Sequence, residues 1–197
     1  MATVDLPQVL PYQPVRMSVE RYHQLTKAGA FTEHDEVELL DGVVTEKMSK
    51  NPPHRIATRR CDLAFSRVVP EGWHVQNQEP VTLQNSEPEP DVAIVRGQLE
   101  DYACRHPGPA EVALVVEVAD TTLVTDRFKA QLYASAGIPV YWIVNLPERV
   151  IEVLQEPTPP ASPTHYATTR CYSADEVIPV VIAGSQVANL QVKDLVP

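Results

Sequence analysis

The clearest pattern in the sequence is a pair of short apolar runs that flank an amphipathic stretch in the middle of the chain. Residues 112–116 (VALVV) and 140–144 (VYWIV) are uninterrupted apolar runs, which are typical of strands buried on both faces. Between them, residues 126–136 carry apolar side chains at helical spacing, and Gly137 follows as a terminator. Because strand, helix and strand follow one another, we predict a βαβ unit with parallel pairing and a right-handed crossover.

Two more helices and a hairpin are predicted in the first seventy residues. Ser18 is a suitable N-cap for a helix that Gly29 ends. The Asp-Gly pair at 41–42, set between two apolar runs, predicts a tight β-hairpin. A second helix is predicted after the proline pair at 52–53, and the Pro-Glu-Gly at 70–72 ends it.

The remaining apolar runs complete one α/β domain. Further strands are predicted at residues 73–79, 81–83, 92–95, 150–154, 166–172 and 177–182. Since a domain takes roughly 150 residues, we expect residues 1–197 to form a single domain with a mixed β-sheet flanked by helices. We expect residues 1–17 to be an extended arm, 156–164 a proline-rich linker or loop, and 165–197 a short β extension.

Composition narrows the class of protein. Hydrophobic residues make up 44% and charged residues 21% of the chain, which is typical of a folded domain and excludes a disordered one. The apolar runs are far shorter than the roughly 20 residues of a membrane helix, and the N-terminus lacks the pattern of a secretory signal. The three cysteines, Cys61, Cys104 and Cys171, lack metal-type spacing, so we expect packing residues in a reducing cytoplasm.

The charge balance restricts how this chain could approach nucleic acid. The formal net charge is −10, whereas proteins that grip nucleic acid by general electrostatics are usually basic. Such a chain needs a local basic patch or a metal ion to approach phosphate. Residues 47–67 carry six basic residues and one acid, which makes them locally basic; the basic residues are Lys47, Lys50, Arg55, Arg59, Arg60 and Arg67.

This basic segment has two interpretations. Arg55, Arg59 and Arg60 could contact phosphates beside an active site, or they could form an ordinary solvated helix face. His54 could reach a phosphate or a metal-bound water, or it could cap the helix.

Three carboxylates lie inside or next to apolar runs. Glu117 is flanked by valines, Asp91 opens the run at 92–95, and Glu38 lies between Val37 and Leu39. An unpaired carboxylate is costly to bury, so each would need a cation, a proton or hydrogen-bond donors. The alternatives are a solvent position past the strand end for Glu117, a turn for Asp91, and the polar face of the hairpin for Glu38.

Lys129 shares the apolar face of its helix with Leu132, Tyr133 and Ala136. Its ammonium could lie near the end of the strand that carries Glu117, or it could extend outward into solvent. In the first case Asp91, Glu117 and Glu38 would hold Mg²⁺, or Mn²⁺ as a substitute, and Lys129 would stabilise developing negative charge.

These residues occur in short motifs that together resemble a known family. The motifs are VELLDG at residues 37–42, PD at 90–91, EVAD at 117–120, and DRFK at 126–129 followed by QLYASAG and IPVYWIV. In this combination the chain resembles the restriction-endonuclease-like family that is greatly expanded in cyanobacteria, a branch of the PD-(D/E)xK nuclease superfamily. The similarity extends from about residue 18 to residue 154.

The resemblance implies a restriction-endonuclease-like α/β core, a divalent metal and DNA as substrate. Asp91 and Glu117 match the metal-binding acids of the family, Glu38 the accessory acid and Lys129 the catalytic lysine. The superfamily pattern has a lysine two positions after the glutamate, but this chain has Ala119 there. In this branch the lysine is found on the following helix, where Lys129 lies.

We therefore expect a Mg²⁺-dependent endodeoxyribonuclease in the cytoplasm. A homodimer is possible, because cutting both strands of DNA usually takes two active sites. One alternative is a catalytically silent nucleic-acid-binding or interaction protein on the same scaffold. Another is a hydrolase of a different phosphate ester. Trp73, Tyr141 and Trp142 are predicted to be core residues rather than base-stacking platforms.

Overall fold

A computed structural model describes residues 14–32, 34–47, 51–158 and 164–197. The α-helices are α1 (Val19–Lys27), α2 (Pro52–Ser66), α3 (Leu123–Ser135) and α4 (Val192–Leu195), and the 3₁₀ turns are η1 (Leu99–Tyr102) and η2 (Pro109–Glu111). The strands are β1 (Val37–Leu40), β2 (Val43–Glu46), β3 (Trp73–Asn77), β4 (Val92–Arg96), β5 (Val112–Ala119), β6 (Val140–Asn145), β7 (Val150–Pro157), β8 (Tyr166–Ser173), β9 (Val177–Ile182) and β10 (Ser185–Gln191).

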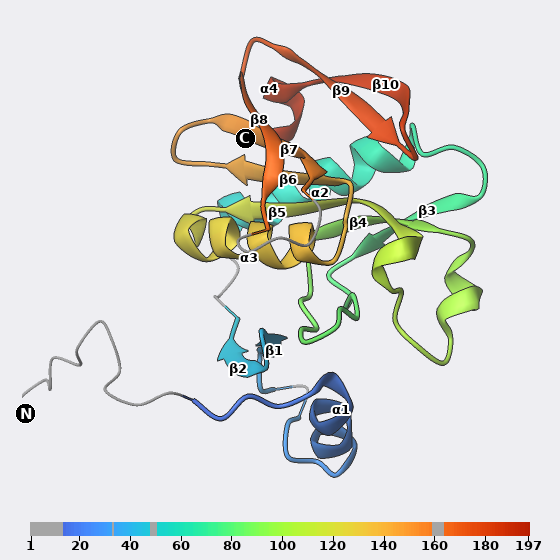
Figure 1. The fold of residues 1–197 in the computed structure, drawn as a ribbon. Helices are drawn as coiled ribbons and strands as arrows, with labels where there is room; N and C mark the ends of the chain where they lie inside the picture. The colour runs from blue at the N-terminus through green and yellow to red at the C-terminus, as the bar shows by residue number, and fades with distance from the viewer. Residues whose placement is uncertain (1–13, 33, 48–50, 159–163) are drawn as a thin grey trace, which may run out of the picture.

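A six-stranded mixed sheet is the centre of the fold (Figure 1). The strand order is β3-β4-β5-β6-β7-β8, and β5 pairs with β6 in parallel while the other neighbours are antiparallel. Helix α3 connects the two parallel strands, so the predicted βαβ unit is confirmed. The predicted fold class, an α/β fold with a mixed sheet flanked by helices, is confirmed as well.

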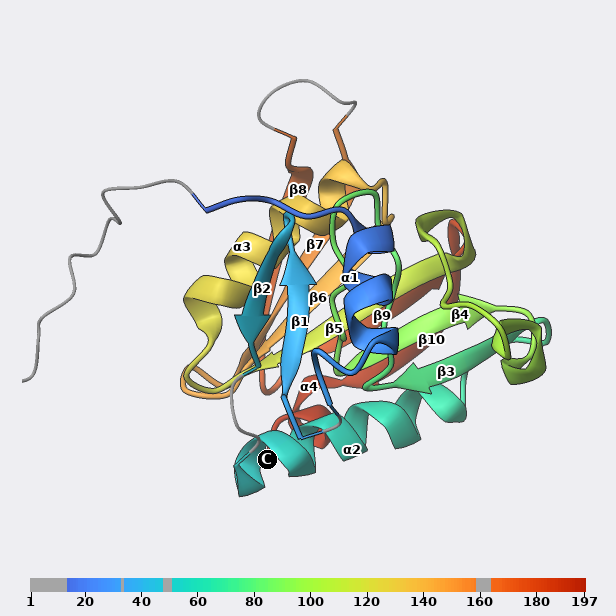
Figure 2. The same ribbon diagram turned by 90° about the horizontal axis from the view of Figure 1, so that it is seen from below.

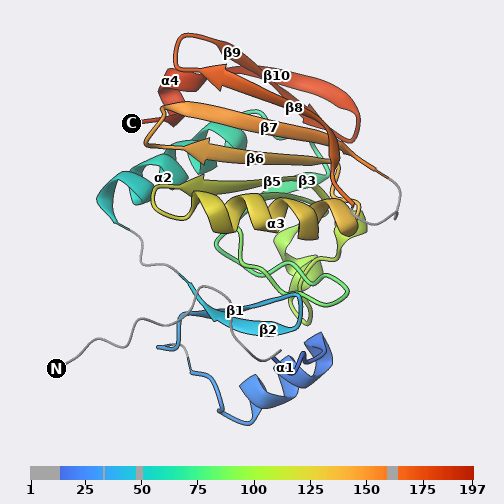
Figure 3. The ribbon, with the colours of Figure 1, turned by 60° about the vertical axis from the view of Figure 1, so that its left-hand side comes forward.

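Both faces of the sheet are covered, which explains why β5 and β6 are buried along their whole length and are mostly apolar (Figure 3). On one face, α2, α4 and the β9–β10 hairpin cover the sheet, and Phe65 of α2 packs against Trp142 of β6 with ring centroids 5.3 Å apart. On the other face α3 packs through Tyr133 against Tyr141.

Helix α1 and the β1–β2 hairpin lie below the sheet, on the side of α3 (Figures 2 and 3). Asp41 and Gly42 both have positive φ angles, 48° and 76°, as a tight two-residue hairpin turn requires. The hairpin is attached to the segment before β4, since Glu87 N donates to Leu39 O at 2.7 Å and Gly42 N to Asn85 O at 2.7 Å. This attachment holds β1 next to the start of β4.

Several predicted boundaries were wrong. Residues 81–83 form no strand, although Val81 and Leu83 are buried, because Val81 N and Leu83 N donate to carbonyls of the same loop, at Pro88 and Ser86. Strand β3 ends before Gln78, whose φ of 53° interrupts the extended backbone. Helix α3 begins at Leu123 rather than at 126, and β10 and α4 were not predicted.

The expectation of three packed cysteines was wrong for two of them. Cys61 lies on the buried face of α2, where burial raises the pKa of its thiol to about 12, but Cys104 and Cys171 are exposed. The aromatic prediction holds, because Tyr141 and Trp142 are fully buried and Trp73 packs partly buried against the core.

Some predicted features lie outside the described residues. These are most of the expected N-terminal arm (residues 1–13), Lys50 in the basic segment, and residues 159–163 of the proline-rich loop. Within the described ranges, no helix is both long and apolar enough to span a bilayer.

The turn of the β1–β2 hairpin gives a test of the fold. A Cβ added to Gly42 would lie 2.8 Å from Arg16 Cβ and would sit at a positive φ, so Gly42→Ala should lower the free energy of unfolding by about 2 kcal/mol or more. Gly72→Ala, at a φ of 83° with open space around its Cβ, is the matched control and should lose only the conformational part. Urea unfolding measures both; equal losses would mean that the contact with Arg16 does not matter.

Candidate active site

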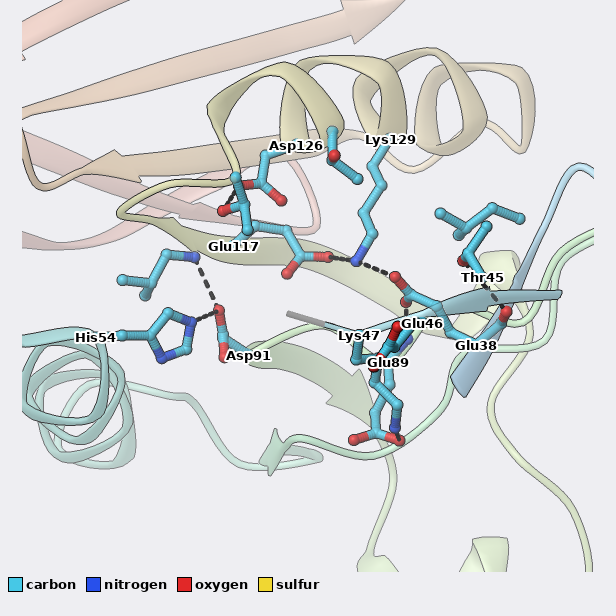
Figure 4. Close-up of a pocket in the computed structure, with 14 residues that line it drawn as sticks. Glu38, Thr45, Glu46, Lys47, His54, Glu89, Asp91, Glu117, Asp126 and Lys129 are labelled. Atoms are coloured by element: carbon cyan, nitrogen blue, oxygen red, sulfur yellow. Dashed lines mark hydrogen bonds and ion pairs between the residues drawn. The ribbon is translucent and has the colours of Figure 1, made fainter. Parts of the chain in front are cut away.

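A pocket of about 220 Å³ opens between the start of β4, the C-terminal end of β5 and the β1–β2 hairpin (Figure 4). The first turns of α2 and α3 complete its lining. Its lining is dominated by carboxyl groups, which outnumber the lysines by six to two. The carboxyl groups belong to Glu38, Glu46, Glu89, Asp91, Glu117 and Asp126, and the lysines are Lys47 and Lys129. Lys47 forms an ion pair with Glu89, so Lys129 is the cation of the inner part of the pocket.

The pairing register brings Asp91 and Glu117 together. Val92 pairs with Val116 in the antiparallel β4–β5 ladder, and one step further along this register Asp91 is opposite Glu117. Both side chains are buried, with relative exposures of 6% for Asp91 and 4% for Glu117. The alternative that Glu117 lies in solvent beyond the strand is therefore wrong.

Helix α3 directs Lys129 into this pocket rather than outward. Lys129 Nζ lies 3.1 Å from Glu117 Oε1 and 2.9 Å from Glu38 Oε1, so one ammonium bridges two buried carboxylates. Burial alone would lower the pKa of Lys129, but the charges of Glu117 and Glu38 outweigh burial and raise it. Lys129 therefore stays charged at every ordinary pH.

Glu38 reaches the pocket from β1 and is held at both oxygens. Its Oε1 pairs with Lys129, and its Oε2 accepts a hydrogen bond from the backbone N–H of Glu89 at 3.2 Å. Because Glu89 closely precedes β4, this bond ties the hairpin to the same sheet edge that carries Asp91. The four residues predicted from sequence, Glu38, Asp91, Glu117 and Lys129, thus line one pocket.

Asp91 is surrounded by hydrogen-bond donors. Its Oδ2 lies 3.1 Å from His54 Nε2 and 2.9 Å from the backbone N of Val118, and its Oδ1 accepts from Gln78 Nε2 at 3.3 Å. Burial works to raise the pKa of Asp91, but the contact with His54 and the other donors outweigh burial and lower it. Asp91 is therefore ionised.

His54, at the start of α2, enters the pocket and contacts Asp91. The first turn of α2 places it there, because Asn51 caps the helix by accepting a hydrogen bond from His54 N. Its Nδ1 lies 3.4 Å from Thr58 Oγ1. The ring of His54 thus contacts Asp91 through Nε2 and Thr58 through Nδ1.

The arginines of α2 lie outside this pocket. Arg55 and Arg59 are exposed, and Arg59 pairs with Asp62 on the same helix. Arg60 donates to the carbonyl oxygen of Val196 at 2.9 Å, so it holds the C-terminal segment against α2. Arg55 and Arg59 border a shallow depression that also includes Gln78, the residue that contacts Asp91.

Two residues of α3 at or behind the pocket, Asp126 in its lining and Tyr133 buried behind it, were not predicted as site residues. Asp126 lies one turn before Lys129 on α3 and accepts a hydrogen bond from Thr122 Oγ1 at 2.5 Å. Tyr133 lies one turn after Lys129 and donates from its hydroxyl to Glu117 Oε1 at 3.0 Å. The helical spacing of these residues around Lys129 was the available signal, since positions three or four apart share one face.

The pocket holds more negative charge than its own lysine neutralises. Burial is the main cause that raises the pKa of Glu117 well above its usual range, and the nearby Asp126, Asp91 and Glu38 add to the effect against the opposing influence of Lys129. A buried carboxylate in this condition favours either a proton or a cation.

The pocket offers carboxylate oxygens, which are the ligands that a hard divalent cation prefers. Among the described residues, no group of three or more His, Cys, Asp or Glu side chains is arranged to hold a metal ion. Mg²⁺, however, commonly takes only one or two carboxylates and keeps water for the rest. Asp91 and Glu117 supply such a pair of oxygen-bearing groups, so the residues present fit a hard divalent ion.

Comparison with known proteins agrees with the fold. A profile of the family described as Uma2, "Putative restriction endonuclease", matches residues 19–191. A comparison with curated proteins gives no significant match.

Two solved structures resemble the chain. The crystal structure of "a putative nuclease belonging to DUF820 from Anabaena variabilis" superimposes with a TM-score of 0.62 at 17% identity, covering 92% of this chain and 97% of the other. Apo NucC of E. coli MS115-1 gives a TM-score of 0.30 at 15% identity, covering 57% of this chain and 48% of the other, and carries no further argument. The superposition on the Anabaena structure supports the fold alone.

Asp126 makes the stability of the fold depend on pH. Burial is the main cause that raises its pKa from 3.8 to about 6, so the folded state binds more protons than the unfolded state between these values. The free energy of unfolding should fall as pH rises through this window, by up to about 3 kcal/mol. Asp126→Asn should remove this contribution and make the fall smaller, and denaturant titrations from pH 4 to pH 7 measure it. The exposed Asp175→Asn is the control and should keep the wild-type profile; an unchanged profile in Asp126→Asn would contradict the assignment.

Proposed function

The chain belongs to the Uma2 family, described as "Putative restriction endonuclease", and from this membership we propose that it is a Mg²⁺-dependent endonuclease that hydrolyses the phosphodiester bonds of DNA. The observation that carries the proposal is the excess of buried carboxylates around one lysine in a pocket of a nuclease-family fold. A phosphodiester is an anion, and such a pocket would repel it unless a cation is bound there.

The residues of the pocket have distinct roles in this proposal. Asp91 and Glu117 supply the carboxylate oxygens for the metal, and Mn²⁺ could replace Mg²⁺ because both prefer oxygen ligands. When bound, a divalent cation lowers the pKa of a coordinated water and neutralises charge on the phosphodiester. Lys129 stabilises the negative charge that develops during attack. Glu38 holds the ammonium of Lys129 in place and supports the waters of the site.

DNA as the substrate is supported by the charge next to the pocket. Arg55 and Arg59 lie on the exposed face of α2, beside the depression that extends to Gln78. A strand whose scissile phosphate is at the pocket would bring neighbouring phosphates towards these arginines. His54 at the start of α2 lies between the two regions and could contact a phosphate near the metal.

Substitution of the two central carboxylates tests the mechanism. Asp91→Asn and Glu117→Gln should each lower the rate of plasmid cleavage in Mg²⁺ by at least about 100-fold, because each removes a charged ligand. Both variants should remain folded, and Glu117→Gln should unfold at a higher temperature, because it removes a buried charge that is costly. Glu100→Gln, at an exposed position on η1, is the control and should cut at the wild-type rate.

The same assay separates the alternatives. Wild-type cleavage should stop with a chelator and return with Mg²⁺ or Mn²⁺. Retention of DNA without cleavage in either metal would favour a silent binding protein. Faster turnover of small phosphate esters than of DNA would favour a different hydrolase. Full cleavage by both variants would refute the mechanism.

The contribution of α2 is tested by salt dependence. Arg55→Gln should reduce the slope of log affinity for duplex DNA against log salt concentration by about 1, as expected for the loss of one phosphate contact. Arg170→Gln removes the same charge from β8, at the edge of the sheet far from the strands that α2 covers, and should leave the slope unchanged. Fluorescence anisotropy with a catalytically inactive Glu117→Gln background measures both, and equal slopes would exclude Arg55 from the interface.

A further inference from the structure

Tyr133 places a buried hydroxyl directly on Glu117. The side chain is fully buried, and its hydroxyl donates to Glu117 Oε1 at 3.0 Å. The ammonium of Lys129 lies 3.1 Å from the same oxygen. Two donors from adjacent turns of α3 therefore converge on one of the two oxygens of this carboxylate (Figure 4 shows the contact from Lys129).

The second oxygen of Glu117 is left for another ligand. In the described part of the chain, every hydrogen bond and ion pair of the Glu117 carboxylate ends on Oε1. In the same ranges, the fully buried side-chain polar atoms without a hydrogen-bond partner are His74 Nε2 and Trp142 Nε1. Oε2 of Glu117 is not among them, so this oxygen is accessible from outside the protein core. Oε2 therefore reaches the space of the pocket, which Glu117 lines together with Asp91.

The ring of Tyr133 cannot move easily. It packs against the ring of Tyr141, with centroids 5.0 Å apart, and Tyr141 in turn stacks on Tyr166. The hydroxyl of Tyr141 donates to Asp126 O at 2.9 Å and that of Tyr166 to Ile138 O at 2.9 Å. This row of buried, hydrogen-bonded tyrosines fixes the position from which the Tyr133 hydroxyl donates.

We propose that Tyr133 is a positioning residue that holds Oε1 of Glu117 and so leaves Oε2 as the oxygen that binds the divalent cation. The inference rests on the proposed function, since it concerns the same metal. Two donors on one oxygen hold the carboxylate in a single orientation. Its other oxygen is therefore already directed towards the pocket before a cation binds.

Direct binding of Mn²⁺ to the full-length chain tests this role without relying on catalysis. Tyr133→Phe keeps the buried ring and removes only the hydroxyl, and the dissociation constant for Mn²⁺, followed by electron paramagnetic resonance of the free ion, should rise about 10-fold. Tyr172→Phe, at a tyrosine of β8 that is buried in the core on the opposite face of the sheet, is the control and should change the constant less than twofold. In cleavage assays the Mg²⁺ concentration for half-maximal rate should rise for Tyr133→Phe, while the rate at saturating Mg²⁺ stays within about threefold of the wild type.

A double-mutant cycle shows whether Tyr133 acts through Glu117. In a Glu117→Gln background, the further change Tyr133→Phe should leave the affinity for Mn²⁺ unchanged, whereas independent effects would add and overturn the inference. Wild-type-like affinity in Tyr133→Phe alone would also overturn it. If the wild-type chain itself binds no Mn²⁺, the metal-dependent function fails, and the inference fails with it. Circular dichroism confirms beforehand that each variant is folded.

Discussion

The ammonium of Lys129 between two buried carboxylates is the interaction on which the arrangement of the pocket depends. Glu117 belongs to the central sheet and Glu38 to the β1–β2 hairpin, so one buried cation joins two parts of the fold. Burying two carboxylates without a partner would cost several kcal/mol, and Lys129 offsets part of that cost. The contact therefore fixes α3, β5 and β1 relative to one another at the place where chemistry is proposed.

The second constraint is backbone pairing around the start of β4. The hairpin is bonded to residues 85–87, Glu89 N donates to Glu38, and the β4–β5 register sets Asp91 opposite Glu117. Each acidic side chain is thus placed by main-chain hydrogen bonds rather than by a flexible loop. Such placement keeps carboxylates close together despite their repulsion. A divalent cation that bound between them would relieve this repulsion.

The sequence predicted the elements better than their connections. The periodicity around residues 112–144 was strong enough to identify β5, α3 and β6, and the acids within apolar runs identified Asp91 and Glu117. Glu38 was predicted at the metal site, but its contact with Lys129 depends on how the hairpin docks, which no local pattern encodes. Tyr133 was visible as an apolar position on the helix, but the partner of its hydroxyl is a tertiary contact.

The position of the lysine on α3 follows from the packing of β5. The superfamily pattern would place it two residues after Glu117, but Ala119 there is fully buried in the core on the side of α3. A lysine at that position would need space that this core does not have. Helix α3 packs over the same face of the sheet. From there the Lys129 ammonium contacts Glu117, while its aliphatic chain stays among apolar neighbours. The proposed mechanism needs an ammonium next to Glu117, and helix α3, which crosses over β5, supplies it.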